Sequence, residues 1–355
     1  MNKIQIAGFT ALTLLGSLSA IQAAEATTDP VGYMSTPCPL GSDTLVTVPF
    51  AGELAYPGAV LGTPIQIDET LTIDVSGTPF IADEYNTLYM LRVTSGASEG
   101  DVFQITGTTA SSIDIDLNGA TPTIVDTTTF RIVKFWTLST LFPPATQTTV
   151  DPAASAFATL NHTLILLPSS GNGINLSSGS SHYILSGQWN IVGGGDSSDT
   201  LLWPGSHFTI RHNAGVTVPT IYTPAGTVDT GKIIIPLNSL QASDQDNYVS
   251  IPRPIDITIA DLGLTTTGTP AVFEPKNGAF DSTFDQIIVF DNTDENQNKS
   301  ASATYFYNND SSQWEKFGSS ADAGTDIIPA ASGIIIRKTA STVDQTVLWT
   351  NTPTY

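Results

Sequence analysis

A serine flanked by glycines is the first feature of the sequence that could do chemistry. Residues 96–100 read Gly-Ala-Ser-Glu-Gly, which places Ser98 at the nucleophile position of the G-x-S-x-G pattern of serine hydrolases. That pattern works where a strand turns sharply into a helix and exposes the hydroxyl. Here residues 88–95 and 101–107 both read as strands, so a hairpin turn explains the glycines equally well. We favour the turn and keep a secreted hydrolase of unknown type as an alternative.

Four histidines are the next candidates for proton transfer or metal binding: His162, His182, His207 and His212. A catalytic triad or a histidine metal site requires such side chains to converge in space. His207 and His212 are an odd number of residues apart, so on a regular strand they would point to opposite faces. We therefore expect surface or capping histidines and predict no catalytic residue.

Two acidic turns could hold a cation. Asp196 and Asp199 lie in one turn, and Asp322 and Asp326 lie in the other, at matching places in two related segments. Carboxylate oxygens are the ligands that calcium prefers, although aspartate is also a common turn residue. The acidic loop 291–298 lacks the central glycine and terminal glutamate of an EF-hand loop. We predict no cofactor, with calcium at the four paired aspartates as the alternative.

Aromatic side chains could provide a platform on which sugar rings stack. Tyr183 and Trp189 recur as Tyr305 and Trp314, whereas Trp203 aligns with an aliphatic residue. Indole and phenol rings combine an apolar face with a polar edge, which suits a sugar. Aromatics that recur in a repeated β-unit are also what core packing produces, and we favour the core. The sugar-binding interpretation requires the indole faces to be exposed to solvent.

These candidates lie in a segment that occurs twice. Residues 181–211 and 303–337 share the order of their aromatic, glycine, proline and arginine residues, and Gln188-Trp189 matches Gln313-Trp314. The length differences lie in turns rich in glycine, serine, asparagine and aspartate, where insertions are tolerated best. A fainter match relates residues 42–50 to residues 245–253. We therefore predict an internally duplicated β-unit.

Short β-branched and aromatic segments, separated by turn residues, run through the whole sequence and predict an all-β fold. In residues 112–117 the isoleucines and the leucine alternate with aspartates, as on a half-buried strand. Helical periodicity is almost absent. We expect antiparallel sandwich or small-barrel units, duplicated, with an inserted N-terminal β-domain.

The first residues have the pattern of a secretory signal peptide. Lys3 precedes an apolar stretch over 6–18, and Ala24-Glu25-Ala26 supplies a small-x-small cleavage site. No later segment is long and apolar enough for a transmembrane helix. The expected organisation is a signal peptide at 1–26, entry strands of the first half at 27–62, an inserted β-domain at 63–141, a linker at 142–155, a first Trp-containing unit at 156–230 and a second half with a second Trp-containing unit at 231–355.

The charge of the chain limits its partners. Among 355 residues, 33 are acidic and 12 are Lys or Arg, which gives a net charge of −21. Nucleic acids and anionic lipids bind basic surfaces, so we exclude nucleic acid as a partner. Cys38 is the only cysteine, so no intrachain disulfide can form, and we favour a buried, inert thiol over an intermolecular disulfide.

Several segments together resemble an uncharacterised family of secreted, duplicated all-β proteins from bacteria of the Verrucomicrobia type. They are DPVGYMSTPCPLGSDTLVTVPF, FWTLSTLFP, DNYVSIPRP, NKSASATYFY, DAGTDIIPAASGIIIRK and WTNTP. The resemblance implies a bacterial exported protein and transfers no activity, ligand or catalytic residue.

We therefore expect an acidic protein exported to the periplasm, the outer cell surface or the medium. The favoured role is a structural or adhesive component of the cell envelope or of the extracellular space, without enzymatic activity. A glycan-binding module that uses the repeated aromatics is the first alternative. The expected partners are a second copy of the chain, through open strand edges, or a cell-surface glycan.

Overall fold

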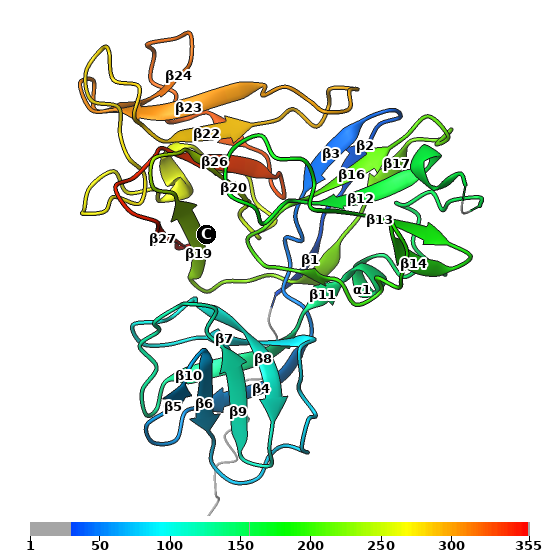
Figure 1. Ribbon diagram of the computed structural model, residues 1–355, viewed down its shortest axis with the longest axis vertical. Helices are drawn as coiled ribbons and strands as arrows, with labels where there is room; N and C mark the ends of the chain where they lie inside the picture. Colours follow the sequence, from blue (N-terminus) through cyan, green and yellow to red (C-terminus); the bar gives the residue numbers. More distant parts are fainter. Residues whose placement is uncertain (1–29, 156, 354–355) are drawn as a thin grey trace, which may run out of the picture.

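The computed structural model describes residues 30–155 and 157–353 and consists almost entirely of strands (Figure 1). The predicted signal peptide at 1–26 lies outside the described residues. Helical structure in the described ranges is limited to α1 (Leu138–Leu141) and two 3₁₀ turns, η1 (Thr159–Asn161) and η2 (Ala260–Leu262). None of these helices is long enough to cross a membrane. The predicted all-β fold class is confirmed, and the sheets are antiparallel and open at their edges.

The lower part of Figure 1 is a seven-stranded sheet, which we call the inserted sheet. Its strands, in spatial order, are β4 (Leu54–Ala59), β10 (Thr129–Lys134), β7 (Tyr89–Val93), β8 (Val102–Thr108), β9 (Ser112–Asp116), β6 (Thr70–Asp74) and β5 (Ile65–Ile67).

The alternation predicted for residues 112–117 is present in the inserted sheet. Ile113, Ile115 and Leu117 are buried in its core, and Asp114 and Asp116 are partly exposed. The sheet begins at β4 and ends at β10, so it starts and ends earlier than the inserted domain that we predicted over 63–141. The helix α1 belongs instead to the next core, because its Leu138 packs in one cluster with Trp189.

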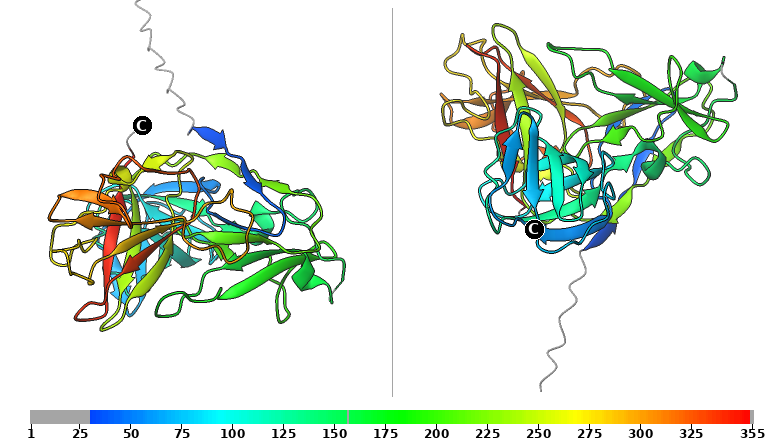
Figure 2. Two further views of the ribbon diagram at one scale, coloured as in Figure 1. Left: turned by 90° about the horizontal axis from the view of Figure 1, so that it is seen from above. Right: turned by 60° about the horizontal axis from the view of Figure 1, so that its bottom comes forward.

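Two five-stranded sheets form the rest of the molecule and share one strand order. The first unit has the order β14 (Gln188–Ile191), β13 (Ser180–Leu185), β12 (Thr163–Leu167), β16 (Phe208–His212) and β3 (Asp43–Val46). The second unit has the order β24 (Gln313–Lys316), β23 (Ala303–Asn308), β22 (Gln286–Val289), β26 (Ile334–Lys338) and β20 (Gln245–Val249). Figure 2 shows the two units side by side.

Short two-stranded ladders complete each unit in the same way. In the first unit β2 (Thr36–Cys38) pairs with β17 (Thr220–Tyr222), and β11 (Trp136–Thr137) pairs with β15 (Leu201–Leu202). In the second unit β19 (Ile233–Ser239) pairs with β27 (Gln345–Asn351), and β21 (Ile257–Thr258) pairs with β25 (Ile327–Ile328). A further ladder joins β1 (Val31–Tyr33) to β18 (Ala225–Thr227). The inserted sheet lies between β3 and β11, where the second unit has only the connection from β20 to β21.

The strand registers correct one detail of the predicted repeat. Strand β13 places His182 opposite Ile165, and β23 places Tyr305 opposite Ile287. Tyr305 therefore corresponds to His182 and not to Tyr183, so the alignment of the two tyrosines is wrong by one residue. The two tryptophans do correspond, since Trp189 pairs with Ile184 and Trp314 pairs with Tyr307, and each of these partners lies two residues after His182 or Tyr305. That the units arose by duplication stays a prediction.

An arginine of the first unit connects it to the second. Arg211 donates from Nε and Nη2 to the two carboxylate oxygens of Asp43, both at 2.6 Å. Its Nη2 also donates to Oδ1 of Asn298, at 2.6 Å, and Asn298 N donates to Asp43 Oδ2 at 2.8 Å. Asn298 belongs to the loop after β22, so the loop 291–298 docks on the first unit.

The second unit makes the reciprocal connection. Arg337 donates to the two carboxylate oxygens of Asp246 at 2.7 and 3.0 Å, and to Oδ1 of Asn175 at 3.0 Å. Asn175 N donates to Asp246 Oδ2 at 2.8 Å, and Asn175 comes from the loop after β12 of the first unit. The two units therefore exchange equivalent loops, each of which completes a charged cluster on the other unit.

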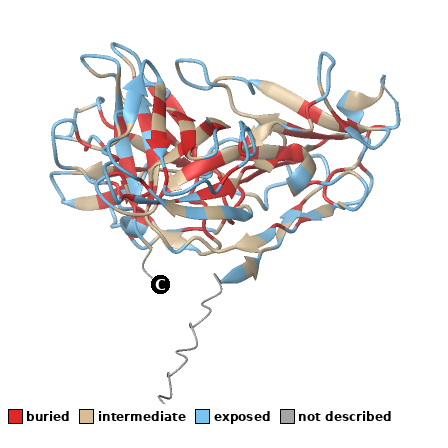
Figure 3. Ribbon diagram, turned by 90° about the horizontal axis from the view of Figure 1, so that it is seen from below, coloured by how far each residue is buried: buried red, intermediate tan, exposed pale blue. Residues whose placement is uncertain are grey.

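The segment predicted as a linker, 142–155, is packed against the first unit. Phe142 and Val150 are buried in the same cluster as Trp189, and Trp189 Nε1 donates to the carbonyl of Phe142 at 3.0 Å. Figure 3 shows how buried and exposed positions alternate along many strands, while the loops are mostly exposed. The hydrophobic residues thus form separate cores for the inserted sheet and for each unit.

A candidate ligand-binding cavity between the three sheets

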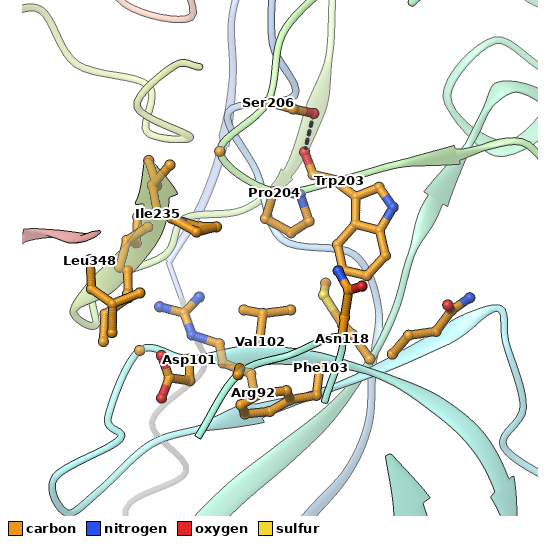
Figure 4. Close-up of a pocket in the computed structure, with 18 of the residues that line it drawn as sticks. Arg92, Asp101, Val102, Phe103, Asn118, Trp203, Pro204, Ser206, Ile235 and Leu348 are labelled. Carbon is orange, nitrogen blue, oxygen red and sulfur yellow. Dashed lines mark hydrogen bonds between the residues drawn. The ribbon is translucent and has the colours of Figure 1, made fainter. Parts of the chain in front are cut away.

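A cavity of about 1020 Å³ lies where the inserted sheet meets the two units (Figure 4). Its floor comes from β7, β8 and the turn after β9, its roof from the turn after β15, and one side from β19 and β27. The cavity therefore exists only because segments from all three parts of the chain come together.

The alternation of strand β8 builds the floor. Phe103 and Ile105 are buried, with Ile105 fully enclosed in the core of the inserted sheet. Val102 and Gln104 point to the opposite face, where they are partly exposed and line the cavity. Asn118, in the tight turn after β9, adds an exposed carboxamide.

Trp203 is the main side chain of the roof. Its indole is 42% exposed and packs edge-on against Phe135, with ring centroids 4.8 Å apart. The turn that carries it is held by Ser206, whose N and Oγ donate to the Trp203 carbonyl at 3.2 and 2.8 Å. At Gly205 the backbone has φ +80°, and a Cβ would lie 2.9 Å from Ile235 Cγ1, so glycine lets the roof approach the side wall.

A cluster of contacts joins the inserted sheet to the second unit at one end of the cavity. Arg92 forms an ion pair with Asp229 and donates from Nη2 to the carbonyl of Lys232 at 2.8 Å. Ile234 N donates to the carbonyl of Gly100 at 3.3 Å. Gly100 has φ +98°, and a Cβ there would lie 2.8 Å from the Lys232 carbonyl oxygen. We call these five residues the latch.

The G-x-S-x-G motif is a turn, as we favoured. It connects β7 to β8, and its two glycines have positive φ angles of 84° and 98°. Ser98 is buried and its Oγ accepts a hydrogen bond from Thr123 N at 2.8 Å. Asp101 follows in the cavity wall, where burial raises its pKa and the Ser98 hydroxyl opposes that shift.

The histidines lie in the first unit and not beside Ser98. His162 Nδ1 contacts Asp151 Oδ2 at 2.6 Å, and His212 lies between the hydroxyls of Thr163 and Thr220, at 2.9 and 2.8 Å. Three of the four, His182, His207 and His212, are buried, so the expectation of surface or capping histidines is wrong for them. Burial lowers the pKa of His182 and of His207 to about 4.

The repeated aromatics are core residues. Trp189 is 0% exposed and Trp314 is 8% exposed, and Tyr305 is buried in the same cluster as Trp314. The stacking platform proposed for these residues is therefore wrong, because their ring faces are covered by protein. Tyr183 is partly exposed on the first unit, and Trp203 is the one candidate that lines the cavity.

The paired aspartates serve as turn residues. Asp196 Oδ1 accepts from Ser198 N and Oγ at 2.8 and 2.7 Å, and Asp322 Oδ1 accepts from Gly324 N at 2.9 Å. Asp326 Oδ2 accepts from the Tyr305 hydroxyl at 2.9 Å, and Asp199 is exposed. Within residues 30–155 and 157–353 no group of three or more His, Cys, Asp or Glu side chains could hold a metal ion. Calcium at the four aspartates stays a prediction.

Cys38 is buried in the core of the first unit. Burial raises the pKa of its thiol above the ordinary value, which favours the unreactive protonated form.

Trp203 is recognisable in the sequence as a candidate ligand-binding residue, whereas the other residues of the cavity are not. Its floor residues are separated from Trp203 by most of the first unit, and nothing in their local pattern marks them. The single-copy indole before Pro204 and Gly205 was the available signal. No family model, curated protein or solved structure matches the chain.

Proposed function

We propose that the protein is an exported adhesive component of the bacterial cell envelope that holds its ligand non-covalently in the three-sheet cavity. The observation that carries the proposal is the half-exposed indole of Trp203 over a cavity of about 1020 Å³. A large exposed aromatic side chain in a concave site is a typical anchor for a ligand. The signal peptide predicted at 1–26 supports export.

The rigid surroundings of Trp203 also support a binding role. The indole packs against Phe135, and the turn around it is fixed by the two hydrogen bonds from Ser206. A side chain that is already ordered loses little conformational entropy when a ligand covers it. The cavity is therefore preorganised for non-covalent capture.

The test is retention at the cell surface. Trp203→Ala should release the protein from the envelope fraction into the medium, whereas wild-type protein stays attached. Phe317→Ala is the matched control, because Phe317 is an aromatic 52% exposed that does not line the cavity. Equal retention of all three proteins would reject the adhesive role of the cavity.

A further inference from the structure

We propose that the cavity binds a neutral carbohydrate, with one sugar ring stacked on the indole of Trp203 and its hydroxyls bonded to the carboxamides of Asn118 and Gln104. This inference rests on the proposed function, because it names the ligand class of the same cavity.

The fold does not require an indole at this position. Leu202 pairs with Trp136 in the first unit as Ile328 pairs with Ile257 in the second, and both Leu202 and Ile328 are buried. The next residue is Trp203 in one unit and a proline in the other, so the sequence alignment of Trp203 with Ile328 is wrong by one residue. Trp203 is therefore an addition to the first unit whose indole is left half exposed.

Two carboxamides, those of Asn118 and Gln104, line the same cavity as this ring. Figure 4 draws the Asn118 side chain beside the indole of Trp203, and both line the cavity. Among the described residues the Asn118 carboxamide has no hydrogen-bond partner, since only its backbone N is bonded, to Asp116. Gln104 uses its Nε2 to donate to the Thr87 carbonyl, which leaves Oε1 as an acceptor. Amides both donate and accept, as sugar hydroxyls do.

The charges around the cavity favour a neutral ligand. Arg92 is engaged by Asp229 and by the carbonyl of Lys232, so its guanidinium is already paired. Asp101 adds a carboxyl to the wall, and the chain carries a net charge of −21, so an anion would be repelled. Asp116 also lines the cavity, and its Oδ1 already accepts from Asn118 N at 3.0 Å. In Figure 4 Asp101 and Trp203 lie at different ends of the cavity.

The volume suits more than one ring. Ligand pockets commonly enclose roughly 300–1,000 Å³, and this cavity of about 1020 Å³ is at the upper end of that range. A short oligosaccharide could therefore extend from Trp203 toward the aliphatic side wall of Ile235 and Leu348.

The experiment uses the mature full chain and calorimetric titration with chitotriose, cellotriose and maltotriose, with trigalacturonic acid as the anionic probe. At least one neutral trisaccharide should bind and should protect tryptophan fluorescence from acrylamide. Trp203→Ala should weaken that binding by about tenfold or more, as expected when a stacking ring is lost. Asn118→Ala should weaken it less, and Phe317→Ala should leave it unchanged.

A conservative variant and the anionic probe make the result decisive. Trp203→Phe retains an aromatic face and should retain part of the affinity, which separates stacking from misfolding. Tighter binding of trigalacturonic acid, or no binding of any neutral trisaccharide, would overturn the carbohydrate proposal. If surface retention still depended on Trp203 in that case, the adhesive function would stand and only the ligand class would be wrong.

Discussion

At the scale of single residues, the two units have different buried polar pairs at one equivalent position. Asp285 and Lys338 form a buried ion pair beside β22 and β26, where Lys338 also donates to the Val272 carbonyl at 2.7 Å. At the same register of the first unit Thr163 Oγ1 contacts His212 Nδ1 at 2.9 Å. A charged pair and a neutral pair thus occupy equivalent positions. Both satisfy the requirement that buried polar groups find partners.

His207 is a buried histidine at the contact between the two units. It is buried, its Nδ1 contacts the Val249 carbonyl at 3.2 Å, and its ring lies 2.6 Å from where a Cβ of Gly333 would be. By the strand registers, Gly333 is the residue of the second unit that corresponds to His207 of the first unit. The imidazole of His207 therefore fills the space between the two units that the absence of a side chain at Gly333 leaves open.

Protonation of His207 should destabilise the protein. Burial lowers its pKa in the folded state from 6.5 to about 4, so the folded protein keeps it neutral while the unfolded chain takes up a proton below pH 6.5. The stability that comes from keeping His207 neutral is complete above pH 6.5 and is lost as the pH falls toward 4. Within that window the free energy of unfolding should fall by about 1.4 kcal/mol per pH unit from this histidine.

Urea unfolding at several pH values measures this contribution. His207→Gln has no titrating ring, so its stability should fall less steeply than that of the wild type between pH 6.5 and 4. Parallel profiles for the two proteins would show that His207 does not titrate as proposed.

At the scale of elements, the latch joins two parts of the chain through a glycine. Gly100→Ala combines an unfavourable positive φ with a contact of 2.8 Å to the Lys232 carbonyl oxygen. Gly77→Ala is the matched control, because Gly77 has φ +78° and open space around its Cβ position. Both variants should lose about 1–2 kcal/mol of stability from the left-handed backbone, and Gly100→Ala should lose more.

Hydrogen exchange separates the two causes. The Ile234 N–H, which donates to the Gly100 carbonyl, should exchange faster in Gly100→Ala and at the wild-type rate in Gly77→Ala. Equal stability losses together with unchanged exchange at Ile234 would mean that the close approach carries no strain.

The elements also show what the sequence could and could not predict. The alternation in residues 112–117 predicted a half-buried strand correctly, because side-chain period and burial coincide there. The recurrence of Trp189 and Trp314 pointed to packing, since both fill the core of their unit. The cavity was not predictable in the same way. It depends on the relative placement of three sheets, which no local pattern encodes.

At the scale of the whole molecule, the inserted sheet is an addition to a pair of similar units. The chain enters and leaves the inserted sheet at neighbouring points of the first unit, since Trp136 Nε1 donates to the Phe50 carbonyl at 3.0 Å. In the second unit the short segment 250–256 connects the equivalent strands β20 and β21. The loops that tie the units together, with Asn175 and Asn298, lie outside the insertion.

Replacing residues 51–135 by a short glycine-serine linker should therefore leave a folded two-unit protein. The core clusters around Trp189 and Trp314 contain no residue of the inserted strands β4 to β10, so far-UV circular dichroism should still show a β-protein with a cooperative unfolding transition. The deletion removes Val102, Gln104 and Asn118 and with them the cavity floor, so trisaccharide binding should be lost even though Trp203 remains. An unfolded product would show that the units need the inserted sheet, and retained binding would place the ligand site elsewhere.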